Sequence, residues 1–365
     1  MFACAMLGRL AAVVLSACAT CAISLALSSC STTIPTPVPP ATAASLLNGG
    51  HDGVLVPLHV ERSDLGQSRL GLPLQIDGRS VYLMFDSGTQ GVRVLSSVLP
   101  RASYPAAGPR TSLALANGAQ VSGALVTLPA GFVGGKAVDV TAQAVDDVRC
   151  QLNARRCIAM DGYTGEFGWA FSGIVGVGAG HMDDACCTPL LRALPGNIGQ
   201  RYVVHANLAR PWLLLSPATK VSDTFTMTPM TPLTPPAPGS EGREGTHQWP
   251  VGCVQIDDKM RFCAPVVFAT GAEGMIRIET DKAPGWLADD KEGNVLKQGN
   301  YNVALGVGSW AHRFDGAQVS IVKAKRGENR IVLGLMALQN IDVLFDFAQG
   351  RLGLRASRPV EAVGE

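Results

Sequence analysis

The residues best suited to do chemistry are an aspartate, Asp86, and the three that follow it, Ser87-Gly88-Thr89. They come directly after the apolar run Val81–Phe85, which is typical of a buried strand. A carboxylate at the end of a strand can serve acid–base catalysis. Catalysis by a carboxylate pair, however, needs one group as the base while the other donates a proton. Asp-Ser-Gly is common in loops, so the tripeptide by itself indicates little.

A second segment of the chain repeats this arrangement without the aspartate. Each copy has a Gln-Ile-Asp turn, an apolar strand, a loop of small and hydroxylated residues, and a later glycine. The first copy runs from Leu74 to Val92 and the second from Val254 to Met275. An apolar-apolar-glycine element follows each copy, at Ile174–Gly176 and at Val332–Gly334. The chain therefore contains an internal repeat.

With this ordered set, the chain resembles the pepsin-like aspartic peptidases from about Leu55 to Ala356. In that family, two homologous β-rich lobes each carry Asp-Thr/Ser-Gly in a loop braced by a later apolar-apolar-glycine strand. The segment Val332–Leu354 also looks like the family's closing segment. The resemblance implies an all-β, two-lobed fold with an internal pseudo-two-fold repeat and few short helices. Short β-prone runs punctuated by Gly, Asn, Asp and Pro point to the same class.

By this resemblance, Asp86 matches the first catalytic aspartate and Ala269 stands where the second should be. A methyl group neither holds a proton nor polarises a water molecule. The nearby carboxylates Asp257, Asp258 and Glu273 lie at a turn or beyond the loop, where they are expected to point away from the site. The resemblance thus predicts a site with half of its catalytic pair.

The resemblance also places a ligand site along the two loops and under a hairpin. The expected binding residues are Ser87, Gly88, Thr89, Thr270, Gly271, Asn117 and Gly118. Asn117-Gly118 suits the turn of a hairpin that could serve as the family's flap. The family's flap usually carries a tyrosine, whereas the nearest one here, Tyr104, lies in a Pro/Gly/Ala-rich loop.

Three functions remain open from the sequence. The leading prediction is a catalytically inactive module that binds an extended peptide or protein segment between its lobes. The first alternative is an active aspartic endopeptidase that uses Asp86 with a second carboxylate from elsewhere. The second alternative is a structural envelope lipoprotein. Asp86 is a ligand contact in the binding module and a catalyst in the peptidase. In the structural protein it only accepts hydrogen bonds that brace its loop.

The amino terminus resembles the leader of a bacterial lipoprotein. Arg9 precedes an uncharged run that ends in Leu27-Ser28-Ser29-Cys30, and in a lipobox of this kind the cysteine thiol takes up a diacylglycerol. An earlier Leu15–Cys18 also fits, but it leaves a shorter apolar core. The alternative is a simple membrane anchor. Because Ser31 and not Asp follows Cys30, the resemblance implies a lipid-anchored protein of the bacterial envelope, in the outer membrane and facing the periplasm.

These features predict an order of segments along the chain. They are a signal peptide (1–29), a lipidated cysteine with a flexible tether (30–50), an amino-terminal β lobe (51–217), a proline-rich linker (218–250), a carboxyl-terminal β lobe (251–358) and a tail (359–365).

Six cysteines lie downstream of the leader, and an even number in an oxidising compartment favours disulfides. Cys253 and Cys263 flank a hairpin turn, and Cys150 and Cys157 enclose a short loop, so each pair is expected to bond. The pairing of Cys186 and Cys187 stays open. We expect no metal and no cofactor. The net charge of +1 also speaks against nucleic acid as a partner, because a phosphate-binding surface needs an excess of Lys and Arg.

Overall fold

A computed structural model describes residues 53–62, 66–101, 103–115, 119–151, 167, 171–179, 186–232, 247–257, 260–272, 274–282, 295–324 and 326–357. All of them belong to the unit that spans 41–365. The described residues do not include the predicted leader, Cys30, Cys157, Asn117 or Gly118. The chain is all-β, as predicted. The helices in the described part are short: α2 (Leu190–Ala193), α3 (Thr219–Ser222) and α4 (Leu335–Leu338).

The first sheet has eight strands in the order β2-β3-β4-β9-β5-β8-β7-β6, with a further pairing between β3 and β7. That pairing closes six of the strands, from β3 to β7, into a ring. The strands are β2 (His59–Arg62), β3 (Ser68–Ile76), β4 (Arg79–Asp86), β5 (Gln90–Leu95), β6 (Ala106–Ala114), β7 (Ala119–Phe132), β8 (Val138–Cys150) and β9 (Gly173–Val177).

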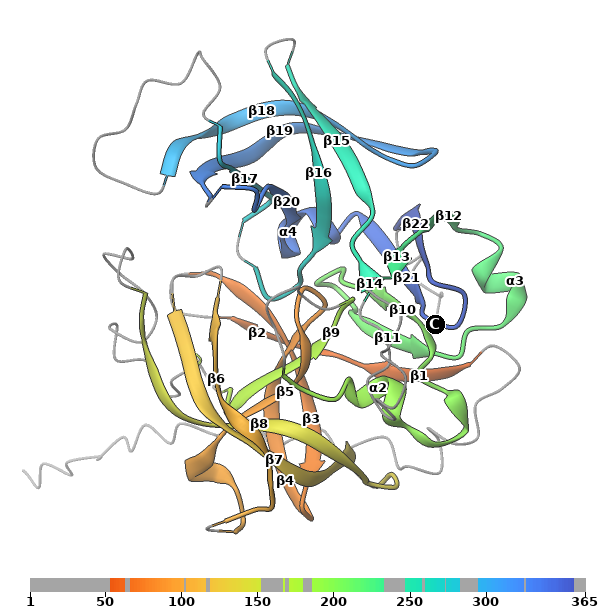
Figure 1. Cartoon of the computed structure of the whole chain (residues 1–365). Helices are drawn as coiled ribbons and strands as arrows, with labels where there is room; N and C mark the ends of the chain where they lie inside the picture. The colour runs from red at the N-terminus through yellow and green to blue at the C-terminus, as the bar shows by residue number, and fades with distance from the viewer. Residues whose placement is uncertain are drawn as a thin grey trace, which may run out of the picture. The chain divides into compact units, whose positions relative to one another are not determined.

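Later strands form a closed barrel in the order β15-β16-β20-β17-β19-β18. Figure 1 shows these strands, in green-blue and blue, grouped apart from the orange and yellow strands of the first sheet. Their bounds are β15 (Val251–Ile256), β16 (Met260–Phe268), β17 (Ile276–Thr280), β18 (Val295–Val307), β19 (Trp310–Lys323) and β20 (Arg330–Leu333).

The two rings of strands share one pairing scheme. β4 runs parallel to β9, and β16 runs parallel to β20 in the same way. β5 then pairs with β9 and β8 as β17 pairs with β20 and β19. Gly91 and Gly274, the later glycines of the two copies, have φ angles of 79° and 80°, a left-handed conformation that favours glycine. The repeat in the sequence therefore corresponds to a repeat in strand topology.

A third sheet takes strands from both ends of the described chain, in the order β1-β11-β10-β21-β22-β12 (Figure 1). They are β1 (Val54–Pro57), β10 (Arg201–His205), β11 (Trp212–Leu215), β12 (Thr226–Pro229), β21 (Ile341–Asp346) and β22 (Arg351–Ala356). A small pair, β13 (Thr231–Pro232) and β14 (His247–Gln248), lies between β12 and β15 in the chain. The predicted linker, 218–250, thus contains α3, β12, β13 and β14.

The inner face of this six-stranded sheet packs under both rings. Tyr202 stacks on Phe345 at 5.2 Å between ring centroids, and its hydroxyl donates to the carbonyl of Val177 at the end of β9. Phe345 meets Trp249 at 5.9 Å, and Trp249 in turn lies 6.1 Å from Phe268, the last residue of β16. Aromatic packing of this kind adds to the burial of apolar surface. The sheet therefore supports the end of one strand from each ring.

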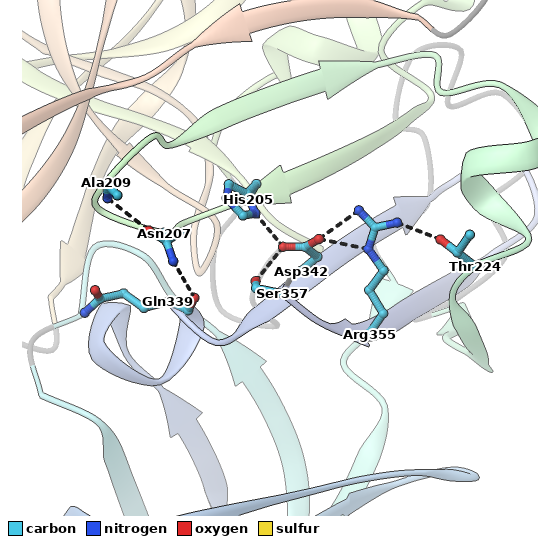
Figure 2. Close-up of polar contacts among 8 residues, drawn as sticks. All are labelled: His205, Asn207, Ala209, Thr224, Gln339, Asp342, Arg355 and Ser357. Carbon is cyan, nitrogen blue, oxygen red and sulfur yellow. Dashed lines mark hydrogen bonds and ion pairs between the residues drawn. The ribbon is translucent and has the colours of Figure 1, made fainter. Parts of the chain in front are cut away.

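The outer face of the sheet carries a buried polar network around Asp342 (Figure 2). Asp342 Oδ1 accepts hydrogen bonds from His205 Nδ1 and Ser357 Oγ, both at 2.6 Å, and its Oδ2 lies 2.8 Å from Arg355 Nε and 2.8 Å from Arg355 Nη2. The imidazole of His205 stacks on Trp212 at 4.7 Å. Burial raises the pKa of Asp342, but the donors from His205, Ser357 and Arg355 outweigh it and hold the pKa below its usual range.

Five of the cysteines lie within the described residues. Cys253 and Cys263 are opposite each other in the β15–β16 hairpin and form a disulfide, as predicted. Cys150 is disulfide-bonded, and its expected partner lies outside the described residues. Cys186 and Cys187 are bonded to each other, a pairing that the sequence left open.

Replacing Asp342 with Asn is expected to lower the free energy of unfolding at neutral pH by about 3 kcal/mol, because Arg355 and His205 lose a buried charged partner. The pKa of Asp342 is lower in the folded state than in the unfolded state. Its contribution is therefore present above the unfolded value of about 3.9 and is lost as the pH falls through the folded value. The difference between the two proteins in urea unfolding should shrink below about pH 4.

Asp146→Asn is the matched control for this prediction. Asp146 pairs with Arg110 at the surface, and the Asp146 side chain is 43% exposed, so its loss should cost much less. A difference between wild type and Asp342→Asn that stays constant below pH 4 would contradict the role given to Asp342.

Candidate functional site

The loop after β4 and the loop after β16 meet through reciprocal hydrogen bonds. The N–H of Ser87 donates to Thr270 Oγ1 at 3.0 Å, and the N–H of Thr270 donates to Ser87 Oγ at 3.1 Å. Each hydroxyl then donates across to the other strand, Ser87 Oγ to the carbonyl of Phe268 at 2.6 Å and Thr270 Oγ1 to that of Phe85 at 3.0 Å. Ser87 is 1% exposed and Thr270 is 0% exposed. Two segments 183 residues apart are thus joined by four buried hydrogen bonds.

Glycines allow the loops to approach this closely. A Cβ atom added to Gly88 would lie 2.4 Å from the Cβ of Ala269, and one added to Gly271 would lie 2.7 Å from the Cγ of Asp86. Each glycine therefore packs on the first residue of the opposite loop, with no space for a side chain. The residue types that the sequence places at these positions are required by the contact between the loops.

Asp86 is held by one backbone donor from each loop. Its Oδ1 accepts the N–H of Gly88 at 2.8 Å and the N–H of Gly271 at 2.9 Å. The residue is 6% exposed. Its Oδ2 has no hydrogen-bond partner among the described residues, and it is not one of the fully buried atoms. One carboxylate oxygen is thus fixed, while the other is open to a donor from outside.

Ala269 gives the second loop an apolar first residue. Its N–H donates to the carbonyl of Leu333 at 2.9 Å, as the strand β16 continues along β20. Asp257 does not supply the missing carboxylate: its Oδ1 accepts the N–H of Asn302 at 3.1 Å, in the turn that precedes β16. That turn is separated from Ala269 by the whole of β16, a length of about 30 Å. Asp258 and Glu273 lie outside the described residues.

Some of the remaining predicted site residues lie at the contact between the loops, and others lie outside the described residues. Thr89 is half-buried beside the first loop, and its hydroxyl is buried without a hydrogen-bond partner. Gly88 and Gly271 are partly exposed at the contact itself. Asn117 and Gly118 lie outside the described residues, so the expected flap stays a prediction. Tyr104 donates to Asp77 Oδ2 at 3.0 Å, in the turn at the start of β4 and not at its Asp86 end.

Ser87 and Thr270 join the two loops, a role that was not predicted from the sequence. Both residues were expected to be ligand contacts, whereas each hydroxyl is buried and donates to a carbonyl of the opposite strand. A signal was available, because a hydroxylated residue occupies the same position in both copies of the repeat. Equivalent hydroxyl groups can bond reciprocally where two copies of a repeat face each other.

Comparison with models of known protein families and with curated proteins finds no match to this chain. Among the described residues, no helix has the length and apolar character needed to cross a membrane. The same residues contain no group of three or more His, Cys, Asp or Glu side chains that could hold a metal ion.

Removing either hydroxyl should destabilise the protein by about 2–3 kcal/mol, because a buried N–H and a buried carbonyl each lose their partner. We expect this for Ser87→Ala and for Thr270→Val in urea unfolding. Since the two hydroxyl groups lie 3.5 Å apart and hold the same pair of loops together, the double variant should lose less than the sum of the single losses.

Ser112→Ala serves as the control, because its hydroxyl bonds Ser122 Oγ at 3.0 Å in a partly buried hairpin. It should cost less than either loop variant. Strictly additive losses for Ser87→Ala and Thr270→Val would contradict coupling between the two hydroxyl groups at this contact.

Proposed function

We propose that this chain is a catalytically inactive module with the two-lobed architecture of the pepsin-like aspartic peptidases, and that it binds an extended peptide or protein segment. The observation that carries the proposal is the meeting of two equivalent loops, with Asp86 at the head of one and Ala269 at the head of the other.

The shared strand pairings of the two rings support the architectural part of the proposal. So does the position of the two loops, since each follows a strand that runs parallel to an apolar-apolar-glycine strand. The six-stranded sheet, which packs against the ends of β9 and β16, is consistent with two lobes joined along one edge.

The hydrogen bonds of Asp86 favour binding over catalysis. A carboxylate pair works by sharing one proton, so each oxygen that faces the partner must be able to accept or hold it. Here Asp86 Oδ1 is bonded instead to two N–H groups, one of them from Gly271 in the second loop. Asp86 Oδ2 keeps the capacity to accept one hydrogen bond. The main-chain N–H groups of an extended peptide are suitable donors for it.

The full-length chain should not cleave an unfolded test protein at acidic pH, with or without a pepsin-type inhibitor. It should instead bind a reduced and carboxymethylated test protein, and Asp86→Asn should weaken this binding about tenfold through loss of a hydrogen bond to a charged acceptor. Ala269→Asp restores the second carboxylate and is expected to introduce cleavage that the inhibitor blocks.

Asp139→Asn, an exposed change on β8, is the control for binding and should have no effect. Inhibitor-sensitive cleavage by the unmodified chain that Asp86→Ala abolishes would show a working peptidase. Absence of both cleavage and binding would favour a structural envelope protein.

We further propose that the chain is attached to the bacterial outer membrane through a lipid on Cys30, facing the periplasm. The support is the run of residues that precedes Cys30 in the sequence. Lipid chains bury methylene groups in the bilayer, and two signals together give stable anchoring.

When the full-length chain is expressed in a bacterium fed with radioactive palmitate, it should become labelled. Cys30→Ser should abolish the label, and Cys18→Ser should leave it unchanged. Labelling that is lost in Cys18→Ser would place the processing site at the earlier candidate. If the unmodified chain takes up no label, a plain membrane anchor is favoured.

A further inference from the structure

Two buried aspartates lie on the outer face of β21. Side chains alternate along a strand, so Asp342 and Asp346 share a face with Leu344 between them. Each is opposite an arginine of β22: Asp342 pairs in register with Arg355, and Asp346 with Arg351. The same acid–base arrangement therefore occurs twice along one pair of strands.

The carboxylates of Asp342 and Asp346 differ in how many hydrogen bonds they accept. At Asp342, Arg355 Nε donates to Oδ2 and Arg355 Nη2 lies 2.8 Å from the same oxygen, while His205 and Ser357 donate to Oδ1 (Figure 2). At Asp346, Arg351 Nη2 is 3.7 Å from Oδ2, beyond a direct hydrogen bond. Among the described residues, the one hydrogen bond to its side chain comes from the N–H of Gln349, 3.1 Å from Oδ1.

The guanidinium of Arg351 donates from Nη2 to Gln349 Oε1, and its buried Nε–H has no hydrogen-bond partner in the described part of the chain. The Arg351 side chain as a whole is 42% exposed, so other parts of its guanidinium can meet an acceptor from outside the chain.

Arg201 adds a second guanidinium at the incomplete end. It lies opposite Asp346 on the neighbouring strand β10, and its Nη2 donates to the carbonyl of Pro217 at 2.7 Å. Among the described residues, no carboxylate lies within ion-pair distance of it. Asp223, exposed at the end of α3, likewise has no ion-pair partner in the described part of the chain. One partly buried positive charge and one exposed negative charge thus remain unpaired.

These two unpaired charges line a pocket of about 370 Å³ on the outer face of the sheet. Arg351 and Asp346 also line it, and Phe225 and Met227 contribute apolar surface. Its volume is at the lower end of the range for small-molecule sites, about 300–1,000 Å³. The pocket therefore suits a small molecule and not a polymer.

We propose that this pocket binds a small zwitterion of the amino-acid type. Its carboxylate would accept hydrogen bonds from the guanidinium groups of Arg201 and Arg351, and its ammonium group would pair with Asp223. An aliphatic side chain would lie against Phe225 and Met227. Guanidinium groups bind carboxylates well because their planar donors match the two oxygens.

The other charges of the pocket are consistent with a zwitterion. Asp346 faces the same space, but it is 2% exposed and already interacts with Arg351 and Gln349. The formal charges that line the pocket sum to zero, with two positive (Arg201, Arg351) and two negative (Asp223, Asp346). A ligand without net charge is therefore favoured over a simple anion, which Asp223 and Asp346 would repel. The site is separate from the Asp86 loops, and the proposal does not depend on the function proposed for them.

Calorimetric titration of the full-length chain with L-leucine tests the proposal. Two analogues each lack one charge: 4-methylpentanoate has no ammonium group, and 3-methylbutylamine has no carboxylate. L-leucine should bind about tenfold more tightly than either analogue, because each analogue leaves one charged group without a partner. No saturable binding of leucine at millimolar concentrations would overturn the proposal. Equal affinity for leucine and 4-methylpentanoate would also overturn it, since it would show an anion site.

Variants locate the binding in this pocket. Asp223→Asn changes an exposed side chain and should weaken leucine about threefold without weakening 4-methylpentanoate. Arg201→Gln should weaken both by about tenfold. Asp139→Asn, outside the pocket, should leave every affinity unchanged. Leucine binding that both pocket variants leave intact would place the site elsewhere and contradict the proposal.

Discussion

The contact between the two halves depends on the pairing of buried backbone groups by two hydroxyls. Ser87 and Thr270 have little or no exposed surface, and around them the N–H groups and carbonyls of both loops need partners. Each hydroxyl accepts from the opposite N–H and donates to the opposite carbonyl. The ends of β4 and β16 are therefore held together, and with them the parallel neighbours β9 and β20.

At this contact the backbones of the two loops are arranged symmetrically, but the side chains of their first residues differ in chemistry. Gly88 and Gly271 bring the loops into van der Waals contact from both sides. On one side the first residue is a carboxylate, and on the other it is a methyl group. With no second carboxylate in the described part of the site, the N–H of Gly271 reaches Asp86 Oδ1 directly. A backbone donor from the second loop thus occupies one oxygen of Asp86.

The six-stranded sheet links this contact to a different surface. Its inner face packs on the ends of β9 and β16 through Tyr202 and the rings around Phe345. Its outer face carries the acid–base pairs of Asp342 and Asp346, one closed by its neighbours and one facing a pocket. A single sheet therefore supports the loops on one side and offers a polar pocket on the other.

The amino-acid sequence by itself indicated the all-β class, the internal repeat and the Cys253–Cys263 disulfide. These features depend on neighbours in the chain: alternating apolar residues predict strands, and two cysteines on either side of a short turn are brought together by the hairpin. The sequence also placed Asp86 and Ala269 at equivalent positions.

Only the tertiary structure decided what Ser87, Thr270, His205 and Asp342 do. Ser87 and Thr270 are 183 residues apart, and His205 and Asp342 are 137 residues apart. A histidine, a serine or an aspartate has no local pattern that names its distant partner, since that partner is set by how the strands pack. The sequence supplied the donors and acceptors, and the packing of strands from distant parts of the chain selected which of them meet.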